Sequence, residues 1–193
     1  MKTALRKIAD VQGGYPFRGS VPEDSGGSAF AVQMKDVSLD GAVAWDALVR
    51  TDITGRRDTD WLRPGDVLFV ARGTRNFALC LGEVPVPAVC SPNFFLLREK
   101  SAAEVLPEFL AWQINQQPAQ RYLRQTAEGS DQLSIRRGTL EELPITLSPL
   151  AQQQHVVALA SLALRERTLH EALIENRERQ LRALAQRLLE ETK

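Results

Sequence analysis

The chain has 193 residues, 44% of them apolar, and its 24 Lys and Arg residues balance 24 Asp and Glu residues. This apolar content is enough to bury one core, and no stretch approaches the roughly 18 apolar residues that a membrane-spanning helix needs. Because the net charge is zero and no basic tail is present, binding to nucleic acid has to use a local basic patch.

The two cysteines, Cys80 and Cys90, are too few for a disulfide framework and lack the spacing of metal ligands. Small buried side chains in a reducing cytoplasm are the favoured interpretation. The first residues, Met1–Ala4, are not followed by the apolar segment of a signal peptide. We therefore expect a soluble, cytoplasmic protein.

A glycine-rich segment, Gln12–Gly19, follows a short amphipathic element of uncertain type at Leu5–Val11. Its glycines permit positive φ and a sharp reversal of the chain. Tyr15 and Arg18 then either project from the loop, in position to contact phosphates or bases, or help to plug the loop into the core. The sequence leaves both alternatives open.

A second loop, rich in hydrogen-bond donors, follows the predicted buried strand Val67–Ala71, which the turn Pro64-Gly65-Asp66 precedes. Arg bridges guanine O6 and N7, Asn bridges adenine N6 and N7, and either side chain can hold a phosphate. An ordinary polar loop is the alternative, and composition alone does not exclude it. The donors of this loop are Arg72, Thr74, Arg75 and Asn76.

The other predicted elements mix strands with helices, which predicts an α+β domain at residues 1–147. Helices are expected to begin at Pro107 and Pro118, because Pro is favoured in the first turn. A polar turn spans residues 129–134, and core segments surround it. Strands are expected at Phe30–Met34, at Asn93–Arg98, and at an edge position over Phe77–Val89, which contains Pro85 and Pro87.

A long coiled-coil-type helix is predicted over residues 148–193, with Ser148 as N-cap and Pro149 at its first position. Its leucines recur every three or four residues, with Glu166 and Arg177 at interrupted positions. At roughly 60 Å it is too long for a small domain to cover, so we expect it to pair with a second copy. A solvated helix packed on its own domain is the alternative. The predicted interface is Leu159, Leu162, Leu169, Leu173, Leu181, Leu184 and Leu188.

No catalytic residue and no metal site is predicted. His155 and His170 lie fifteen residues apart in the long helix, without a Glu-x-x-His partner. The phosphate-binding pattern G-x-x-x-x-G-K-[ST] is missing from the sequence. The chain is therefore interpreted as a binding module.

Four blocks in order cover nearly the whole chain: Leu5–Gly19; Leu62–Thr74, with its Pro-Gly-Asp and Arg-Gly-Thr; Gly129-Ser130; and the proline-rich Leu143–Val157. Together they resemble the DNA-specificity (S) subunits of type I restriction–modification enzymes. One departure is Gln152, which stands where the family usually has Glu; the favourable effect of an acidic group at a helix N-terminus is lost there.

The resemblance implies half of such a subunit, because full-length members have two target-recognition domains and two long antiparallel helices. It implies double-stranded DNA and methyltransferase (M) subunits as partners, possibly with a restriction (R) subunit. No cofactor is expected on this chain, since S-adenosylmethionine belongs to the M subunit. A homodimer would read a palindromic, interrupted site, with the helix pair fixing the distance between half-sites.

The resemblance does not identify DNA contacts, so these are predicted from side-chain chemistry. A coiled-coil adaptor without nucleic-acid binding is the alternative function, and for any single residue a salt-bridged surface role is the alternative. The predicted DNA-binding residues are Tyr15, Arg18, Lys35, Arg72, Thr74, Arg75, Asn76, Gln132, Arg136 and Arg137.

Overall fold

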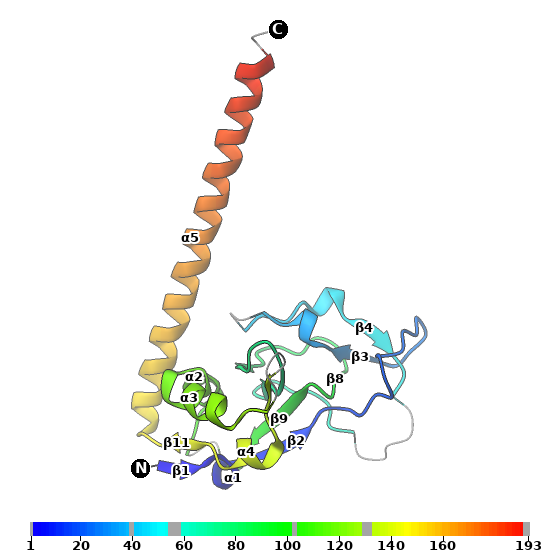
Figure 1. Ribbon diagram of the computed structural model, residues 1–193, viewed down its shortest axis with the longest axis vertical. Helices are drawn as coiled ribbons and strands as arrows, with labels where there is room; N and C mark the ends of the chain where they lie inside the picture. Colours follow the sequence, from blue (N-terminus) through cyan, green and yellow to red (C-terminus); the bar gives the residue numbers. More distant parts are fainter. Residues whose placement is uncertain (1, 39–40, 54–58, 102–103, 129–132, 191–193) are drawn as a thin grey trace. The chain divides into compact units, whose positions relative to one another are not determined.

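The structure is a computed structural model that describes residues 2–38, 41–53, 59–101, 104–128 and 133–190 (Figure 1). The chain forms two compact units, Met1–Gln154 and His155–Lys193. Among the described residues, the first unit contains the strands and four short α-helices, and the second is the rest of one long helix that ends at Glu190. The predicted α+β class with a long C-terminal helix is confirmed.

Apart from the long C-terminal helix, the elements of the chain are short, as expected for a chain with frequent Pro and Gly. The helices are α1 (Leu5–Ile8), α2 (Pro107–Ile114), α3 (Gln117–Thr126), α4 (Arg137–Glu141) and α5 (Leu150–Glu190), with 3-10 turns η1 (Met34–Asp36) and η2 (Trp45–Ala47). The strands are β1 (Lys2–Ala4), β2 (Ala9–Gly13), β3 (Ala29–Val32), β4 (Val49–Thr51), β5 (Val67–Val70), β6 (Arg72–Gly73), β7 (Ala78–Cys80), β8 (Ala88–Cys90), β9 (Phe94–Glu99), β10 (Leu133–Ser134) and β11 (Pro144–Thr146).

Two sheets enclose the main core. An antiparallel sheet has the order β2-β9-β5-β7, and a second sheet has the order β4-β3-β8, in which β3 and β8 are parallel. Two further pairs, β1-β11 and β6-β10, are antiparallel, and β1 lies beside β11 near the N-terminus (Figure 1). Buried side chains of both sheets form one cluster that includes Val32, Leu68, Val70, Leu79, Ala88 and Phe94.

Strand β5 is an unbroken apolar run because both of its faces are buried. Leu68 and Val70 face the cluster between the sheets, while Val67 and Phe69 alternate to the other face. Helix α2 contacts β5 and β7. A strand covered on both faces has no solvent-facing position, so all four residues are buried.

The side-chain amides of Gln113 in α2 and of Asn115 at its C-cap form hydrogen bonds with the backbone of two neighbouring strands. Asn115 accepts from the Ala78 N–H (2.8 Å) and donates to the Ala78 carbonyl (2.7 Å), which satisfies the free edge of β7. Gln113 makes the same two-way pair with the backbone of Thr146 at the end of β11. These bonds fix α2 against two edges that would otherwise leave backbone groups unpaired.

The strand expected over Phe77–Val89 is instead divided into β7 and β8, with no strand over the intervening residues 81–87. Each half is an edge strand, but of a different sheet. The prolines Pro85 and Pro87 lack the N–H that continued pairing requires, so the chain crosses between sheets there. Similarly, the strand expected to reach Met34 ends at Val32, since Asp36 accepts from the Gln33 N–H (2.9 Å) and closes η1.

The glycines of the first loop act differently from the prediction. Among them only Gly19 has positive φ (85°). A Cβ on Gly14 would lie 2.0 Å from the Ser91 carbonyl oxygen, so this position needs Gly for close approach of two backbones. The backbone bonds from Gly14 N–H to Phe94 O (3.1 Å) and from Tyr15 N–H to Cys90 O (2.7 Å) hold the crossing in place.

The turn Pro64-Gly65-Asp66 is fixed by a nearly buried ion pair. Asp66 accepts from Arg98 Nε (2.7 Å) and Nη2 (3.0 Å), and its second oxygen also accepts from the Arg63 N–H (2.8 Å). Gly65 has φ 86°, the left-handed conformation that this turn requires. The hydrogen bond with Asp66 raises the pKa of the Arg98 guanidinium above its ordinary value.

We expect Asp66→Asn to lower the free energy of unfolding by about 3 kcal/mol, because it leaves the partly buried Arg98 without its main counter-charge. For a chain of this size that corresponds to a fall in Tm of roughly 6–12 °C, measurable by circular dichroism. Glu142→Gln, which breaks the exposed Arg6–Glu142 pair, is the control and should cost under about 1 kcal/mol. Equal effects of the two variants would contradict this account.

The long helix begins one residue later than predicted. Pro149 O accepts from the Gln153 N–H (3.1 Å), so Pro149 takes the capping position and Leu150 is the first helical residue. The Ser148 carbonyl accepts from the side chain of Gln153 (2.8 Å). Among the described residues, every helix is too short or too polar to cross a lipid bilayer.

Candidate nucleic-acid interface

The donor-rich loop between β5 and β7 is closed by bonds within itself. The Val70 N–H donates to Phe77 O (2.8 Å), and Asn76 Nδ2 donates to Val70 O (3.0 Å). Asn76 is buried at 7% exposure, so in this conformation its amide shapes the loop and is not presented to a ligand. This differs from the expectation that Asn76 would be available to read a base.

The loop is joined by a segment some sixty residues further along the chain. Strand β6 pairs with β10, with Arg72 opposite Ser134 and Gly73 opposite Leu133, and the Ile135 N–H donates to Ala71 O (2.9 Å). Ser134 also forms a bridge with Glu128 at the end of α3. The tertiary structure thus places Arg72 next to the segment that leads to Arg136.

Three side chains of this loop, Arg72, Thr74 and Arg75, are exposed, as is Lys35 on the neighbouring turn η1; we refer to these four residues as the basic loop cluster. Lys35 belongs to it through its neighbour Met34, whose sulfur would lie 3.3 Å from a Cβ built on Gly73. Its three cations make no ion pair with any residue in the described part of the chain. Unpaired cations on a loop are suited to binding phosphate oxygens or guanine edges.

A recess of about 300 Å³ lies beside the basic loop cluster. Its walls are mainly apolar, and Thr74 and Arg75 add polar groups. A Cβ built on Gly73 would lie 3.3 Å from the Met34 sulfur, a tight contact, and 3.6 Å from Val70, an ordinary one. The lining residues are Met34, Val37, Val70, Gly73, Thr74, Arg75 and Phe77.

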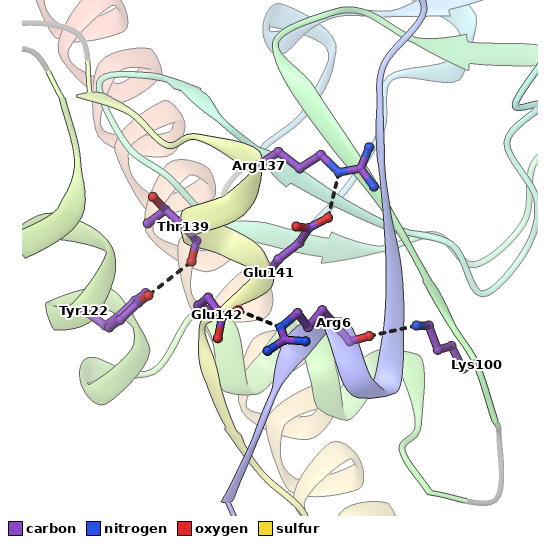
Figure 2. A network of polar contacts seen from close by, with 7 residues as sticks. All are labelled: Arg6, Lys100, Tyr122, Arg137, Thr139, Glu141 and Glu142. Carbon is purple, nitrogen blue, oxygen red and sulfur yellow. Dashed lines mark hydrogen bonds and ion pairs between the residues drawn. The ribbon is translucent and has the colours of Figure 1, made fainter.

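Arg136 and Arg137 lie near this loop but have acidic partners. Arg136 Nε is 2.9 Å from Glu128. Arg137 Nε is 2.7 Å from Glu141 one turn along α4, a pair that Figure 2 shows. Side chains of both arginines are more than half exposed, and such pairs are weak enough for a phosphate to compete with them.

The position of α4 is fixed by the polar contacts drawn in Figure 2. Tyr122 Oη of α3 donates to Thr139 O (3.2 Å), and Arg6 Nε of α1 donates to Glu142 (2.6 Å). Lys100 Nζ in turn donates to Arg6 O (2.8 Å). The segment that presents Arg136 and Arg137 is therefore anchored from both α1 and α3.

The remaining predicted residues are not joined to the basic loop cluster by these contacts. Tyr15 is half-buried, packs on Phe17 with ring centroids 4.8 Å apart, and lines a small recess with Asp60 and Cys90. Arg18 is exposed. The aromatic residues of this loop thus pack on each other and are half-buried, and DNA contact by Tyr15 and Arg18 stays a prediction. Gln132 lies outside the described residues.

The structure adds two arginines that the sequence analysis did not single out. Arg121 and Arg124 are exposed on α3, and within the described ranges neither has an ion-pair partner. Helix α3 leads directly to Glu128, which bridges to Ser134 opposite Arg72. Their i, i+3 spacing on an amphipathic helix was the available signal.

The cysteines are not reactive-site candidates. Burial raises the pKa of Cys80 and of Cys90 to about 12, with the Glu108 charge contributing at Cys80. Within the described residues, no three His, Cys, Asp or Glu side chains are grouped as metal ligands would be.

We expect both thiols to resist iodoacetamide at pH 8 in the native protein and to react fully in denaturant, as measured by mass spectrometry. Because the folded pKa lies above the unfolded value of 9.0, the contribution of these two thiols to stability should be constant below pH 9 and be lost as pH rises toward 12. Rapid alkylation of Cys80 in the native state would contradict this burial.

Comparison with known proteins gives matches to solved structures. No family model and no curated sequence matches the chain. An S subunit of the type I system of M. genitalium matches with TM-score 0.55 and 14% identity, over 84% of this chain. The HsdS subunit of Thermoanaerobacter tengcongensis matches with TM-score 0.55 and 17% identity, over 86%. A chain from a structural study of type I R-M system assembly matches with TM-score 0.58 and 19% identity, over 91%.

The chain has the fold of a type I specificity subunit. It spans about two fifths of the length of the three matched chains, with 38%, 37% and 41% of them covered. Two of the sequence blocks that resemble S subunits now have a physical explanation in this fold. Pro64-Gly65-Asp66 forms the turn that holds Arg98, and Arg72-Gly73-Thr74 contains strand β6 and two of the four residues of the basic loop cluster.

Proposed function

We propose that this chain is the DNA-reading component of a type I restriction–modification complex. Its first unit contacts one half of a bipartite target, and the chain docks on methyltransferase subunits that perform the chemistry. The chain itself is non-catalytic and binds no cofactor directly. S-adenosylmethionine would be bound by the partner.

The observation that supports this proposal is the basic loop cluster on a fold similar to that of S subunits. The chain has no net charge, so the field of the whole protein does not attract DNA. Local cations without acidic partners then become the main candidates for phosphate and base contacts. Arg72 and Arg75 have the planar guanidinium that bridges guanine O6 and N7.

We further propose that two copies pair through α5. The seven predicted interface leucines are 52–68% exposed in the single chain, which leaves their apolar surface in water. Isolated exposed leucines are common, but a stripe at coiled-coil spacing over one helix is the pattern of an interface. Two-fold pairing would place two reading domains on an inverted repeat. The alternative is that α5 pairs with a different specificity chain. Measuring the mass of the protein by light scattering distinguishes the two cases.

A binding-site selection with random duplex DNA tests the function. The purified chain is used alone and together with its methyltransferase subunit, at a fixed salt concentration because affinity depends on salt. Enrichment of one half-site, repeated in inverted orientation at a fixed spacing, is the expected result. Failure to enrich any sequence under both conditions would reject a DNA-reading role and favour a coiled-coil adaptor.

A further inference from the structure

The recess beside the basic loop cluster has apolar walls in a region that is otherwise cationic. Its apolar side chains are Met34, Val37, Val70 and Phe77. Val70 is buried, but the other three are only half-buried, so part of their apolar surface faces solvent. Binding of phosphate by the neighbouring cations does not use this surface. A partner that does use it has to combine negative charge with an apolar part.

Every residue of the basic loop cluster lies at this recess or next to it in the chain. Thr74 and Arg75 line it directly, and Lys35 and Arg72 are each adjacent in sequence to a lining residue. None of the three cations has an acidic partner in the part of the chain that the structure describes. The charge around the recess therefore favours an anionic ligand, such as a nucleotide with its phosphate.

Hydrogen bonds hold the walls of the recess in place without a ligand. The capping box of η1 fixes the turn that carries Met34. Asn76 Nδ2 donates to Val70 O (3.0 Å), the Val70 N–H donates to Phe77 O (2.8 Å), and Gly73 is paired in β6 with β10. A preformed pocket loses little conformational freedom on binding, so the inward amide of Asn76 favours binding indirectly.

The size of the recess separates two ways in which apolar walls can contact DNA. A stacked thymine offers only its methyl group in the major groove, whereas a base turned out of the stack offers its whole ring. A methyl group is close in size to a water molecule, which occupies about 30 Å³ in the liquid, and it would leave most of the 300 Å³ recess unfilled. Ligand pockets begin at roughly 300 Å³, and a recess of this size suits one planar base.

The lining side chains suit the faces of a base better than its edges. The Phe77 ring and the Met34 thioether are groups that contact aromatic faces. Thr74 and Arg75 are the polar lining residues, and they can bond to one edge or to the adjoining phosphate. Contacts through the faces tolerate any base, because every base has a π-face.

We infer that the recess is a pocket for one nucleobase of the bound DNA, turned out of the helical stack, with its flanking phosphate on the cations of the basic loop cluster. This inference rests on the proposed function. Turning a base out costs its stacking and pairing, and this cost is least where the base is already mismatched. A mismatch at that position should therefore strengthen binding. At a position that is read while stacked, a mismatch brings no such gain.

The test is a mismatch scan of the selected duplex with the full-length chain. Each position of the half-site and its flanks is mismatched in turn by changing only the opposite base, under the condition in which the selection succeeds. Val37→Phe and Met34→Phe fill the recess from two different residues of its wall. Val86→Phe is the matched control, because Val86 is also half-buried against the core cluster but is not among the lining residues.

In the wild type and in Val86→Phe, a mismatch at one position is expected to strengthen binding by at least about 5-fold. In both filling variants this gain should fall below about 2-fold, and the fully paired duplex should bind at least about 5-fold more weakly, because the base has no pocket. Thermal unfolding followed by circular dichroism shows that each variant is folded. Deoxyuridine in place of each thymine removes only the methyl group and is measured in parallel.

The scan of the wild type alone can overturn the inference, since a duplex in which no mismatch strengthens binding leaves no extruded base. A gain that persists in both filling variants would place the base in another site. Weaker binding with deoxyuridine at one thymine, without any gain from a mismatch, would assign the recess to a stacked thymine methyl group. A wild type that selects no sequence would instead reject the proposed function, so the two failures are distinguishable.

Discussion

Reversing two charges of the basic loop cluster, in Arg72→Glu with Arg75→Glu, is expected to weaken sequence-specific DNA binding by at least about 100-fold. Each bidentate base contact is worth about 1–3 kcal/mol, and carboxylates at these positions also repel phosphates. Both side chains are exposed and no described acidic residue pairs with them, so the fold should be unaffected. Fluorescence anisotropy with the selected duplex, at one fixed salt concentration, measures the change.

Arg63→Glu, which reverses one charge where the double variant reverses two, is the control outside the basic loop cluster. Arg63 is exposed just before β5, whereas Arg72 follows the other end of the same strand. The control should retain affinity within about 3-fold, since only general electrostatics change. If the double variant bound DNA as tightly as the wild type, the basic loop cluster would not be part of the DNA interface. A coiled-coil adaptor would keep its partner and its function despite the two substitutions.

Replacing two leucines of α5, in Leu169→Glu with Leu173→Glu, is expected to convert a dimer into a monomer. These side chains are 62% and 52% exposed in the single chain, and burying one Leu completely is worth about 1.5–3 kcal/mol. A charge facing its own copy across a two-fold axis adds repulsion. Light scattering should show the mass fall to that of one 21.5 kDa chain.

The control for the helix is Leu164→Glu with Thr168→Glu, which has the same four-residue spacing on the opposite side of α5. It introduces the same charge and should leave the mass of the dimer unchanged. A double Leu variant that keeps the wild-type mass would show that the leucine stripe is not the interface. A monomeric wild type that doubles in mass only with a second specificity chain would replace self-pairing by hetero-pairing.

Local sequence signals predicted much of the first unit. The turn Pro64-Gly65-Asp66 and the buried strand after it are where expected, because a turn residue with positive φ and an apolar run are local properties. Helices α2 and α3 begin within one residue of the predicted prolines for the same reason. The division of Phe77–Val89 into two strands was missed, since the choice of sheet depends on neighbours distant in sequence.

The candidate interface was predictable only in part. Arg72, Thr74 and Arg75 are exposed, as expected for the hydrogen-bond donors of this loop. Their binding to DNA stays a prediction. Asn76 reads in sequence like the others, yet its amide turns inward to Val70 O, because a loop that reverses this sharply has to satisfy its own backbone. A salt-bridged role was the alternative for Arg136, and Glu128 is brought beside it by the bridge to Ser134.

By itself, the sequence determined the class of the fold, the long helix with its leucine stripe and the presence of donor-rich loops, because helix propensity, apolar periodicity and turn chemistry act over a few residues. Only the tertiary structure decided that β6 pairs with β10, that Gly14 crosses the backbone at Ser91, and that Gln153 is buried at the root of α5. Each of these depends on segments tens of residues apart, whose contacts are set by packing of the whole domain and leave no periodic trace in the chain.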